Sequence, residues 1–434
     1  MAQFRTDVSK LDNSHLITRY EVGMLSDRLT PGESMLDAFG KLRVSPSVTL
    51  FDSTHRYQDN GKWSTANTAS GFITHRSNES AVDLIVKTAV NAEVVRETYR
   101  VFTYQPGKSL MIMNTFAMHD DNSKTGVRQR VGYFNSDNGV FLEKLGANVY
   151  FVLRSKTTGT VVDTRVLQSN WNKDTFTSNS YSTQTGANFT AGLDVTKANI
   201  MWVDLEWLGV GDVRCGFVVD GIPIQAHVFH GENVNYSTYM TTATLPLRYE
   251  IKNTIATTSN SVLKQICSSV ISEGGYERVT PMTVVRSTAN VTISTSASFT
   301  PVLSVRLASN RLDAVLIPAK INFFPTSGDN FEVALIKNAT LTGASYDTTS
   351  YTNIDVDKTA TAITGGTMVR HEYVASTNQG VTPLNHQLTG YNFEMQLGRT
   401  TGGVSDVLTL AARVIKNTGT GTGMGSLSFY DLTN

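Results

Sequence analysis

The chain has 434 residues, of which 40% are hydrophobic and only 17% are charged, against the roughly 25% charged residues of a typical soluble domain. At roughly 150 residues per domain, this length predicts two or three domains. The 37 basic and 37 acidic residues cancel at pH 7, so the basic excess that a nucleic-acid partner requires is missing.

The uncharged polar residues and the two cysteines further restrict the fold class. Serine, threonine, asparagine and glycine recur throughout, which favours short β-strands over helix bundles. Cys215 and Cys267 lie in apolar surroundings, which predicts two buried thiols and excludes a disulfide scaffold or a cysteine-ligated metal. Residues 1–7 carry no secretory signal, and no stretch approaches the ~20 apolar residues of a membrane span. We therefore expect a soluble chain that is made in the cytoplasm and has no membrane partner.

Residues 1–36 are predicted to form an extended N-terminal arm. They mix polar residues with scattered apolar ones, and Thr30-Pro31-Gly32-Glu33 is a turn signal. An arm that orders only against a neighbouring subunit and a loosely packed terminal segment both fit this pattern.

From about residue 41 the pattern is that of β-strands. Gln105-Pro106-Gly107-Lys108 is predicted to be a tight turn, with residues 110–116 as the strand that returns from it. Runs of branched and aromatic residues predict further strands at 48–51, 83–86, 94–104, 131–134, 140–142, 149–153 and 161–162. Many short strands separated by turns favour a β-sandwich over an alternating α/β fold.

Residues 200–230 predict three antiparallel strands in a row. Gly209-Val210-Gly211-Asp212 forms the first turn, and Asp220-Gly221 is a strong signal for the second, a tight hairpin. This meander resembles the hairpins of concanavalin-like (jelly-roll) sandwiches, a likeness of fold that implies no ligand. Residues 261–272 fit either a helix or a strand by spacing, and their serine content favours a strand.

A domain boundary is predicted near residues 274–283, beyond which the chain becomes richer still in threonine and serine. The predicted fold class is therefore all-β. A concanavalin-like or jelly-roll sandwich at residues 37–280 is followed by a smaller β-sandwich at 281–434.

Two glycine motifs resemble phosphate-binding loops, but the residues around them do not complete either motif. Gly107-Lys108-Ser109 matches the end of a phosphate-binding loop, but the required earlier glycine is replaced by Phe102 and no helix follows. Gly209 and Gly211 lack the third glycine of a dinucleotide fingerprint. Both motifs are interpreted as turns, and no cofactor is expected.

Histidine pairs and carboxylate pairs are the candidates for a metal or a catalytic site. His227 and His230 would face opposite sides of one strand, and His119-Asp120-Asp121 lies elsewhere, so edge histidines are favoured over a metal site. Asp204 and Glu206 share one strand face, as paired catalytic carboxylates could, but the solvent side of an amphipathic strand is the commoner case. We therefore predict no catalytic, metal or cofactor residue, and no enzyme.

Four tryptophans could stack on sugar rings: Trp63, Trp171, Trp202 and Trp207. Alternation with apolar neighbours predicts that Trp207 is in the core, whereas Trp202 is the candidate for an exposed or interfacial position. A core position is favoured for most of them.

Several stretches resemble a family of structural virion proteins of large tailed bacteriophages, including those of cyanophage type. The resemblance spans about residues 35–280 and lies in segments 37–45, 49–52, 104–109, 131–134, 138–139, 204–214, 245–251 and 272–276. It implies a virion protein that assembles with neighbouring proteins, and it carries over no catalytic residue.

Two functions follow as hypotheses. The first is a structural component of the virion, in the tail, neck or baseplate or on the capsid surface. It would assemble in the host cytoplasm with other virion proteins and with copies of itself, as trimers or larger rings. The alternative is a glycan-binding module for host adsorption, suggested by the meander and by the aromatic residues. A third class, a glycan-cleaving enzyme that uses Asp204 and Glu206, is disfavoured because two such carboxylates are more commonly the solvent side of a strand.

Overall fold

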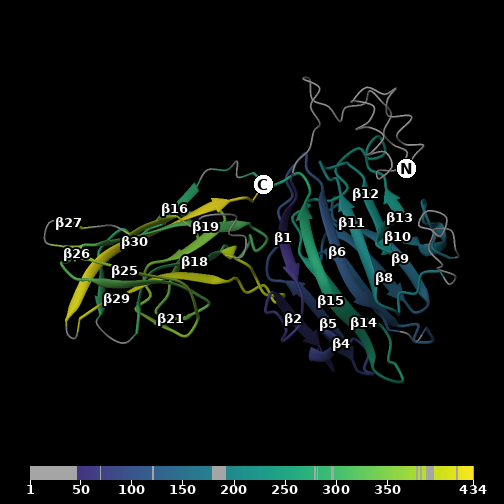
Figure 1. Ribbon diagram of the computed structural model, residues 1–434, viewed down its shortest axis with the longest axis horizontal. Coiled ribbons are helices and arrows are strands. Elements are labelled where there is room, and N and C mark those ends of the chain that lie inside the picture. Colours follow the sequence, from purple (N-terminus) through teal and green to yellow (C-terminus); the bar gives the residue numbers. More distant parts are fainter. Residues whose placement is uncertain are drawn as a thin grey trace, which may run out of the picture. The chain divides into compact units, whose positions relative to one another are not determined.

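A computed structural model describes residues 46–433, apart from 69, 120–121, 178–191, 278–279, 281, 295–297, 378–379, 382–383, 388–394 and 417–418 (Figure 1). The predicted arm at residues 1–36 lies outside the described residues. Within them, the secondary structure is β-strands and two short 3-10 helices, η1 (Ser77–Glu79) and η2 (Gln168–Asn170). None of these helices is long and apolar enough to cross a membrane. The all-β fold class is confirmed.

The first sandwich contains an eight-stranded sheet in the order β13-β12-β11-β6-β15-β4-β3, with β1 also paired to β15. Every pairing in this sheet is antiparallel. Its strands are β1 (Val48–Ser53), β3 (Gly71–Arg76), β4 (Ala81–Val86), β6 (Leu110–Ala117), β11 (Asn199–Leu205), β12 (Val213–Val219), β13 (Ile222–Phe229) and β15 (Ser261–Ser272).

A seven-stranded antiparallel sheet in the order β10-β9-β8-β7-β14-β5-β2 packs against the first one (Figure 1). Alternate residues of each strand point into the space between the sheets, as Ile112 of β6 and Val131 and Tyr133 of β7 do. The strands are β2 (Trp63–Thr68), β5 (Glu93–Thr98), β7 (Val127–Phe134), β8 (Gly139–Leu145), β9 (Asn148–Ser155), β10 (Val162–Leu167) and β14 (Leu247–Asn253).

Local turn signals predicted the meander correctly. Strands β11, β12 and β13 are consecutive and antiparallel. Asp220 and Gly221 turn the chain with φ of 50° and 78°, the left-handed values that a tight hairpin of this kind requires. Residues 261–272 form β15 in full, so the preference for a strand there is confirmed.

The expected hairpin around residue 106 is wrong. The turn itself exists, because the Lys108 N–H donates to the Gln105 carbonyl at 3.1 Å and Gly107 has a φ of 85°. However, β5 already ends at Thr98 and belongs to the seven-stranded sheet, whereas β6 belongs to the eight-stranded one. The chain between them crosses from one sheet to the other, so these strands are not partners.

The second sandwich is built from a five-stranded and a six-stranded sheet. The first comprises β16 (Met282–Arg286), β17 (Val291–Ser294), β19 (Leu316–Pro325), β28 (Leu384–Gln387) and β30 (Thr420–Asp431). The second comprises β18 (Thr300–Leu307), β20 (Phe331–Lys337), β22 (Tyr346–Asp347), β23 (Ile354–Asp357), β25 (Thr367–Val374) and β29 (Val407–Val414). Two small hairpins complete it, β21 (Thr340–Thr342) with β24 (Ala362–Thr364) and β26 (Ser376–Thr377) with β27 (Gly380–Val381).

A separate apolar core fills the second sandwich. Phe323 of β19, Phe331 of β20 and Phe429 of β30 are fully buried within it. Two β-sandwiches in succession are therefore confirmed as the architecture, and the boundaries at residues 36 and 280 stay predictions.

Candidate functional site

A cleft of about 480 Å³ opens on the first sandwich beside the β9–β10 hairpin, and we call it the β9–β10 cleft. One wall comes from this hairpin and the other from the end of β13 and the segment that follows it. The lining residues are Leu153, Ser155, Thr157, Thr158, Val162, Thr164, Val228, Phe229, His230, Asn235, Tyr236, Ser237, Thr238 and Tyr239.

The segment that follows β13 is held at both ends. The Gly231 carbonyl accepts the N–H groups of Val234 and Asn235 at 3.3 and 3.1 Å, and the Tyr239 N–H donates to the Gly209 carbonyl at 3.0 Å. At its start, His230 Nδ1 lies 3.0 Å from a carboxylate oxygen of Asp212. The residues between these anchors therefore keep a defined position at the mouth of the cleft.

Tyr236 is the most exposed of the large hydrophobic and aromatic side chains in the described residues. Beside it, Asn235, Ser237 and Thr238 are also exposed, and their side chains make no hydrogen bond to any described residue. An aromatic face next to unused hydroxyl and amide groups can bind a ligand that has both apolar and hydroxyl-bearing faces. The lining contains no aspartate, glutamate, lysine or arginine, and its one histidine, His230, already contacts Asp212, so the cleft fits an uncharged ligand.

His227 and His230 differ in their surroundings. His227 is buried, its Nδ1 accepts the Asn172 N–H at 3.3 Å, and burial lowers its pKa to about 4. The His119 main chain donates to Gln129 at 2.8 Å, while Asp120 and Asp121 lie outside the described residues. In the part of the chain that the structure describes, no three histidine, cysteine or acidic side chains are grouped as metal ligands.

Asp204 and Glu206 differ from the predicted pair of solvent-facing carboxylates. Asp204 is buried on β11 and forms an ion pair with Arg214, its direct partner on β12. Burial, which outweighs the attraction of Arg214, raises the pKa of Asp204 to about 6. Glu206 lies beyond the end of β11 and is exposed, so the two carboxylates do not share a strand face.

The loop at Lys108 and Ser109 is tied to the end of β15. The Ser109 hydroxyl donates to Glu273 at 2.7 Å, and the Glu273 N–H donates to the Ser109 carbonyl at 3.0 Å. Gly211 likewise closes a turn by donating to the Trp207 carbonyl at 2.7 Å. Both glycine motifs are turns, as the sequence predicted.

The tryptophans are occupied by packing. Trp63 and Trp171 lie in the core, and Trp207 packs against its rim. Trp202, the expected platform, is only 6% exposed, because its ring covers Gly216 of the neighbouring strand β12. Of the cysteines, Cys215 is buried as expected, whereas Cys267 is half-buried.

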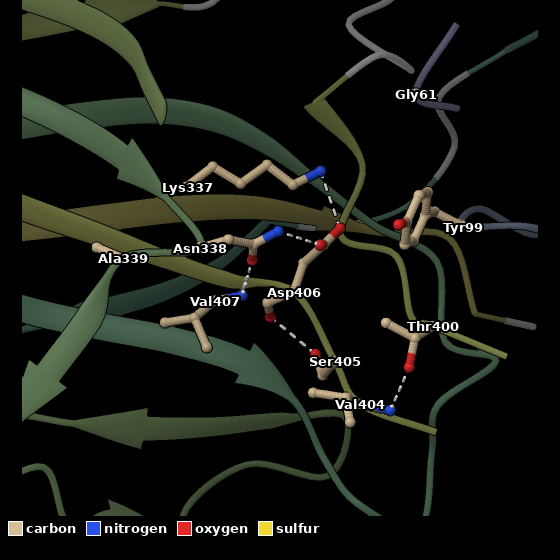
Figure 2. A pocket seen from close by; sticks show the side chains of 10 residues that line it. All are labelled: Gly61, Tyr99, Lys337, Asn338, Ala339, Thr400, Val404, Ser405, Asp406 and Val407. Carbon is tan, nitrogen blue, oxygen red and sulfur yellow. Dashed lines mark hydrogen bonds and ion pairs between the residues drawn. The ribbon is translucent and has the colours of Figure 1, made fainter. Parts of the chain in front are cut away.

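A second cavity, of about 500 Å³, has five lining residues whose polar side-chain groups already have partners, namely Lys337, Asn338, Thr400, Ser405 and Asp406 (Figure 2). Asp406 accepts from Asn338 at 2.7 Å and from Lys337 and the Gly398 N–H, both at 2.8 Å. The Asn338 oxygen in turn accepts the Val407 N–H at 2.9 Å. A ligand that used these groups would have to break their hydrogen bonds. The bonds therefore stabilise the local structure and make this cavity a weaker candidate for ligand binding than the β9–β10 cleft.

Ion pairs also occupy the outer face of the seven-stranded sheet. Glu250 accepts from Arg128 and Arg248 at 2.8 Å and from Arg130 at 3.3 Å, and Arg130 also donates to Glu143 at 2.7 Å. Glu250 and Glu143 on this face are thus both paired with arginines.

No protein-family model and no curated protein matches the chain. Among solved structures it is similar to an endo-β-1,4-glucuronan lyase from the fungus Trichoderma reesei, with 11% identity over 51% of this chain and 95% of the lyase and a TM-score of 0.34. A carbohydrate esterase from the Shiga toxin-encoding bacteriophage phi24B matches 52% of this chain and 99% of its own, with 10% identity and a TM-score of 0.30. The CBM2 module of the evolved Dit of Lactobacillus casei phage J-1 matches 54% and 100%, with 6% identity and a TM-score of 0.33.

These comparisons correct the prediction that the chain is not an enzyme. Two of the three structures are enzymes, a lyase and an esterase, so an all-β sandwich of this kind gives no ground for that exclusion. Identities of 6–11% and TM-scores of 0.30–0.34 carry no activity over to this chain.

The sequence prediction missed the β9–β10 cleft altogether. Its walls come from residues 153–164 and 228–239, which are far apart in the chain and carry no motif. The one local signal is the largely polar segment 233–238 around Tyr236, in which Asn235-Tyr236-Ser237 matches a glycosylation sequon that the sequence alone gives no reason to use.

Proposed function

We propose that the β9–β10 cleft binds an uncharged carbohydrate and that the chain serves a tailed-bacteriophage particle in attachment to its host. The observation that carries the binding half is the fully exposed Tyr236 at the mouth of a cleft. Beside it, the side chains of Asn235, Ser237 and Thr238 make no hydrogen bond to any described residue. An exposed tyrosine ring offers the apolar faces of a sugar a rigid surface at low entropic cost.

The particle half of the proposal is supported by the sequence. The resemblance of residues 35–280 to structural virion proteins of tailed phages implies a chain that assembles with neighbouring proteins. An assembly role in the tail, neck, baseplate or capsid surface is compatible with carbohydrate binding, because adsorption requires a binding site that the particle displays.

Carbohydrate binding is tested with a glycan array and with isothermal titration against the sugar that the array selects. Tyr236→Ala should weaken binding roughly tenfold or more, because an aromatic residue at the centre of a binding site contributes well over 1 kcal/mol. The matched control is Tyr57→Ala, since Tyr57 is also highly exposed but lies outside the cleft. A wild-type chain that binds no glycan, or equal losses in both variants, would refute the cleft as a carbohydrate site.

Gold-labelled antibodies against the chain, imaged on purified virions by electron microscopy, test the particle role. Label on the head, neck or tail would place the chain on the virion. Unlabelled particles, with the chain free in the lysate, would refute a virion component and leave the binding proposal standing on the array alone.

A further inference from the structure

Strand β10 is the last strand on its side of the seven-stranded sheet. In the described chain it pairs only with β9, in an unbroken register from Val162 opposite Ser155 to Leu167 opposite Tyr150. On its far side, the backbone groups of every second residue are therefore without a partner strand among the described residues.

This edge lacks the features that usually block strand addition. Edge strand β13 contains Pro223 and a bulge opposite Cys215 and Gly216, and edge strand β25 contains a bulge opposite Leu335 and Ile336. In contrast, β10 has no proline, no lysine and no bulge. Val161 and Val162 at its start are 44% and 49% exposed. Charged side chains can also protect an edge, but the two on β10, Asp163 and Arg165, have opposite signs and so need not repel a second copy that runs in the opposite direction.

The direction of the backbone groups on β10 follows from its neighbours. The Gly146 N–H donates to the Val127 carbonyl, which sets the alternation of hydrogen-bonded pairs from β7 through β8 to β9. Carried to β10, this alternation turns the N–H and C=O groups of Asp163, Arg165 and Leu167 away from β9.

The sequence of β10 is complementary to itself when it is read in the opposite direction about Thr164. Asp163 then faces Arg165 of a second copy, Val162 faces Val166, and Thr164 faces itself. Within one chain Asp163 and Arg165 already form an ion pair at 2.9 Å, and they also pair with Arg154 and Glu143 at 2.8 Å, so both charges are ordered before a partner arrives. A shift by one residue would instead set Asp163 against Thr164 and lose both charge pairs.

We propose that β10 pairs antiparallel with the β10 of a second copy of this chain, about a two-fold axis at Thr164. Asp163 and Arg165 of the second copy then exchange two backbone hydrogen bonds, and the symmetric pair exchanges two more. The seven-stranded sheets of the two copies join into one continuous sheet.

The pairing itself does not depend on the proposed carbohydrate binding. Its consequence for avidity does rest on that proposed function. Thr164 lines the β9–β10 cleft and also lies on the axis, so the clefts of both copies flank that axis. A polymer with repeated sugars can then bind two sites at once and gain avidity.

Sedimentation equilibrium of the full chain tests the pairing. Thr164→Lys and Thr164→Glu each place like charges against each other at the axis, and each should shift the wild-type dimer to monomer. An equimolar mixture of the two variants places lysine against glutamate and should restore the dimer. Thr88→Lys, at an exposed threonine outside β10 and the cleft, should leave the dimer unchanged.

Each outcome decides the proposal. A monomeric wild-type chain at about 0.1 mM, or a dimer that persists in both Thr164 variants, overturns it, as does a mixture that stays monomeric. Circular dichroism of the variants separates loss of pairing from loss of folding, and Thr164→Glu serves if Thr164→Lys does not fold. A dimeric wild type that binds no glycan refutes the carbohydrate site alone, whereas a monomer that binds glycan refutes the pairing alone.

Discussion

At the scale of single residues, the fully buried charge of Glu250 shows how the outer face of the seven-stranded sheet is stabilised. Burial by itself opposes ionisation of this carboxyl, but Arg248, Arg130 and Arg128 outweigh burial and lower its pKa to about 2. Removing one partner from such a group leaves the remaining buried charges uncompensated. This lowers the stability of the fold more than replacing the whole group by apolar residues would.

Glu250→Gln should therefore destabilise the fold by about 3 kcal/mol at neutral pH. Because the pKa in the folded state lies below the ordinary value of 4.5, the contribution is complete above pH 4.5 and is lost as the pH falls towards 2. Urea unfolding at pH 7 and at pH 2.5 should show a large difference between wild type and variant at pH 7 and a small one at pH 2.5.

Glu79→Gln is the matched control, since Glu79 pairs with Lys264 at the surface. An exposed pair of this kind contributes less than about 1 kcal/mol. Equal effects of the two substitutions would contradict the account of Glu250.

At the scale of elements, the packing of β11 against β12 explains why Trp202 is unavailable to a ligand. Trp202 lies opposite Gly216 in the register of these strands. A Cβ at Gly216 would come within 2.6 Å of the indole ring and 2.1 Å of the Ile224 carbonyl oxygen. Only glycine lets the ring lie flat on the sheet at this position.

Gly216→Ala should lower the free energy of unfolding by about 2 kcal/mol or more, because the rigid ring and the backbone cannot both yield. The midpoint of urea unfolding measures this loss. Gly328→Ala is the control, since a Cβ there meets nothing within 4 Å, and it should change stability by less than about 0.5 kcal/mol. A tolerated Gly216→Ala would show that the strands separate more easily than the structure indicates.

Elements were predictable from the sequence where their signals are local. Asp220-Gly221 sets a hairpin by its own backbone preferences, so the meander β11-β12-β13 was predicted with its turns. The pairing of strands that are far apart in the sequence was not predictable. Residues 105–108 carry no local signal that β5 and β6 belong to different sheets.

The same reason applies to the candidate site. Alternation predicted that Asp204 and Trp202 lie on the face opposite the core, but it cannot say that Arg214 and Gly216 on the next strand bury them. The β9–β10 cleft depends on two segments that only the folded chain brings together, and the position of Tyr236 there has no counterpart in local spacing.

At the scale of the whole molecule, zero net charge at pH 7 leaves no long-range repulsion between copies. Of the eight histidines, His55 and His227 have pKa values lowered to about 4, chiefly by burial, and stay neutral in mild acid. Because the sequence pI is about 7.1, the chain as a whole carries a net positive charge at pH 5.5.

Solubility should therefore pass through a minimum near pH 7 and rise at pH 5.5. Precipitation with polyethylene glycol at fixed ionic strength measures it directly. The Thr164→Lys variant should be more soluble than wild type at pH 7, because it gains a charge at the open edge. A solubility that falls steadily from pH 7 to pH 5.5 would contradict this expectation.

The pairing of β1 with β15 also constrains how the chain is made. Val48, in the first strand of the sandwich, has Ser272 as its partner, so the eight-stranded sheet cannot be completed until the ribosome has released nearly the whole of that sandwich. At roughly 5–20 residues per second, this delay is on the order of ten seconds or more. During that interval the apolar faces of the early strands have no partner, and a nascent chain of this design depends on chaperones or on slow collapse more than a protein with local contacts does.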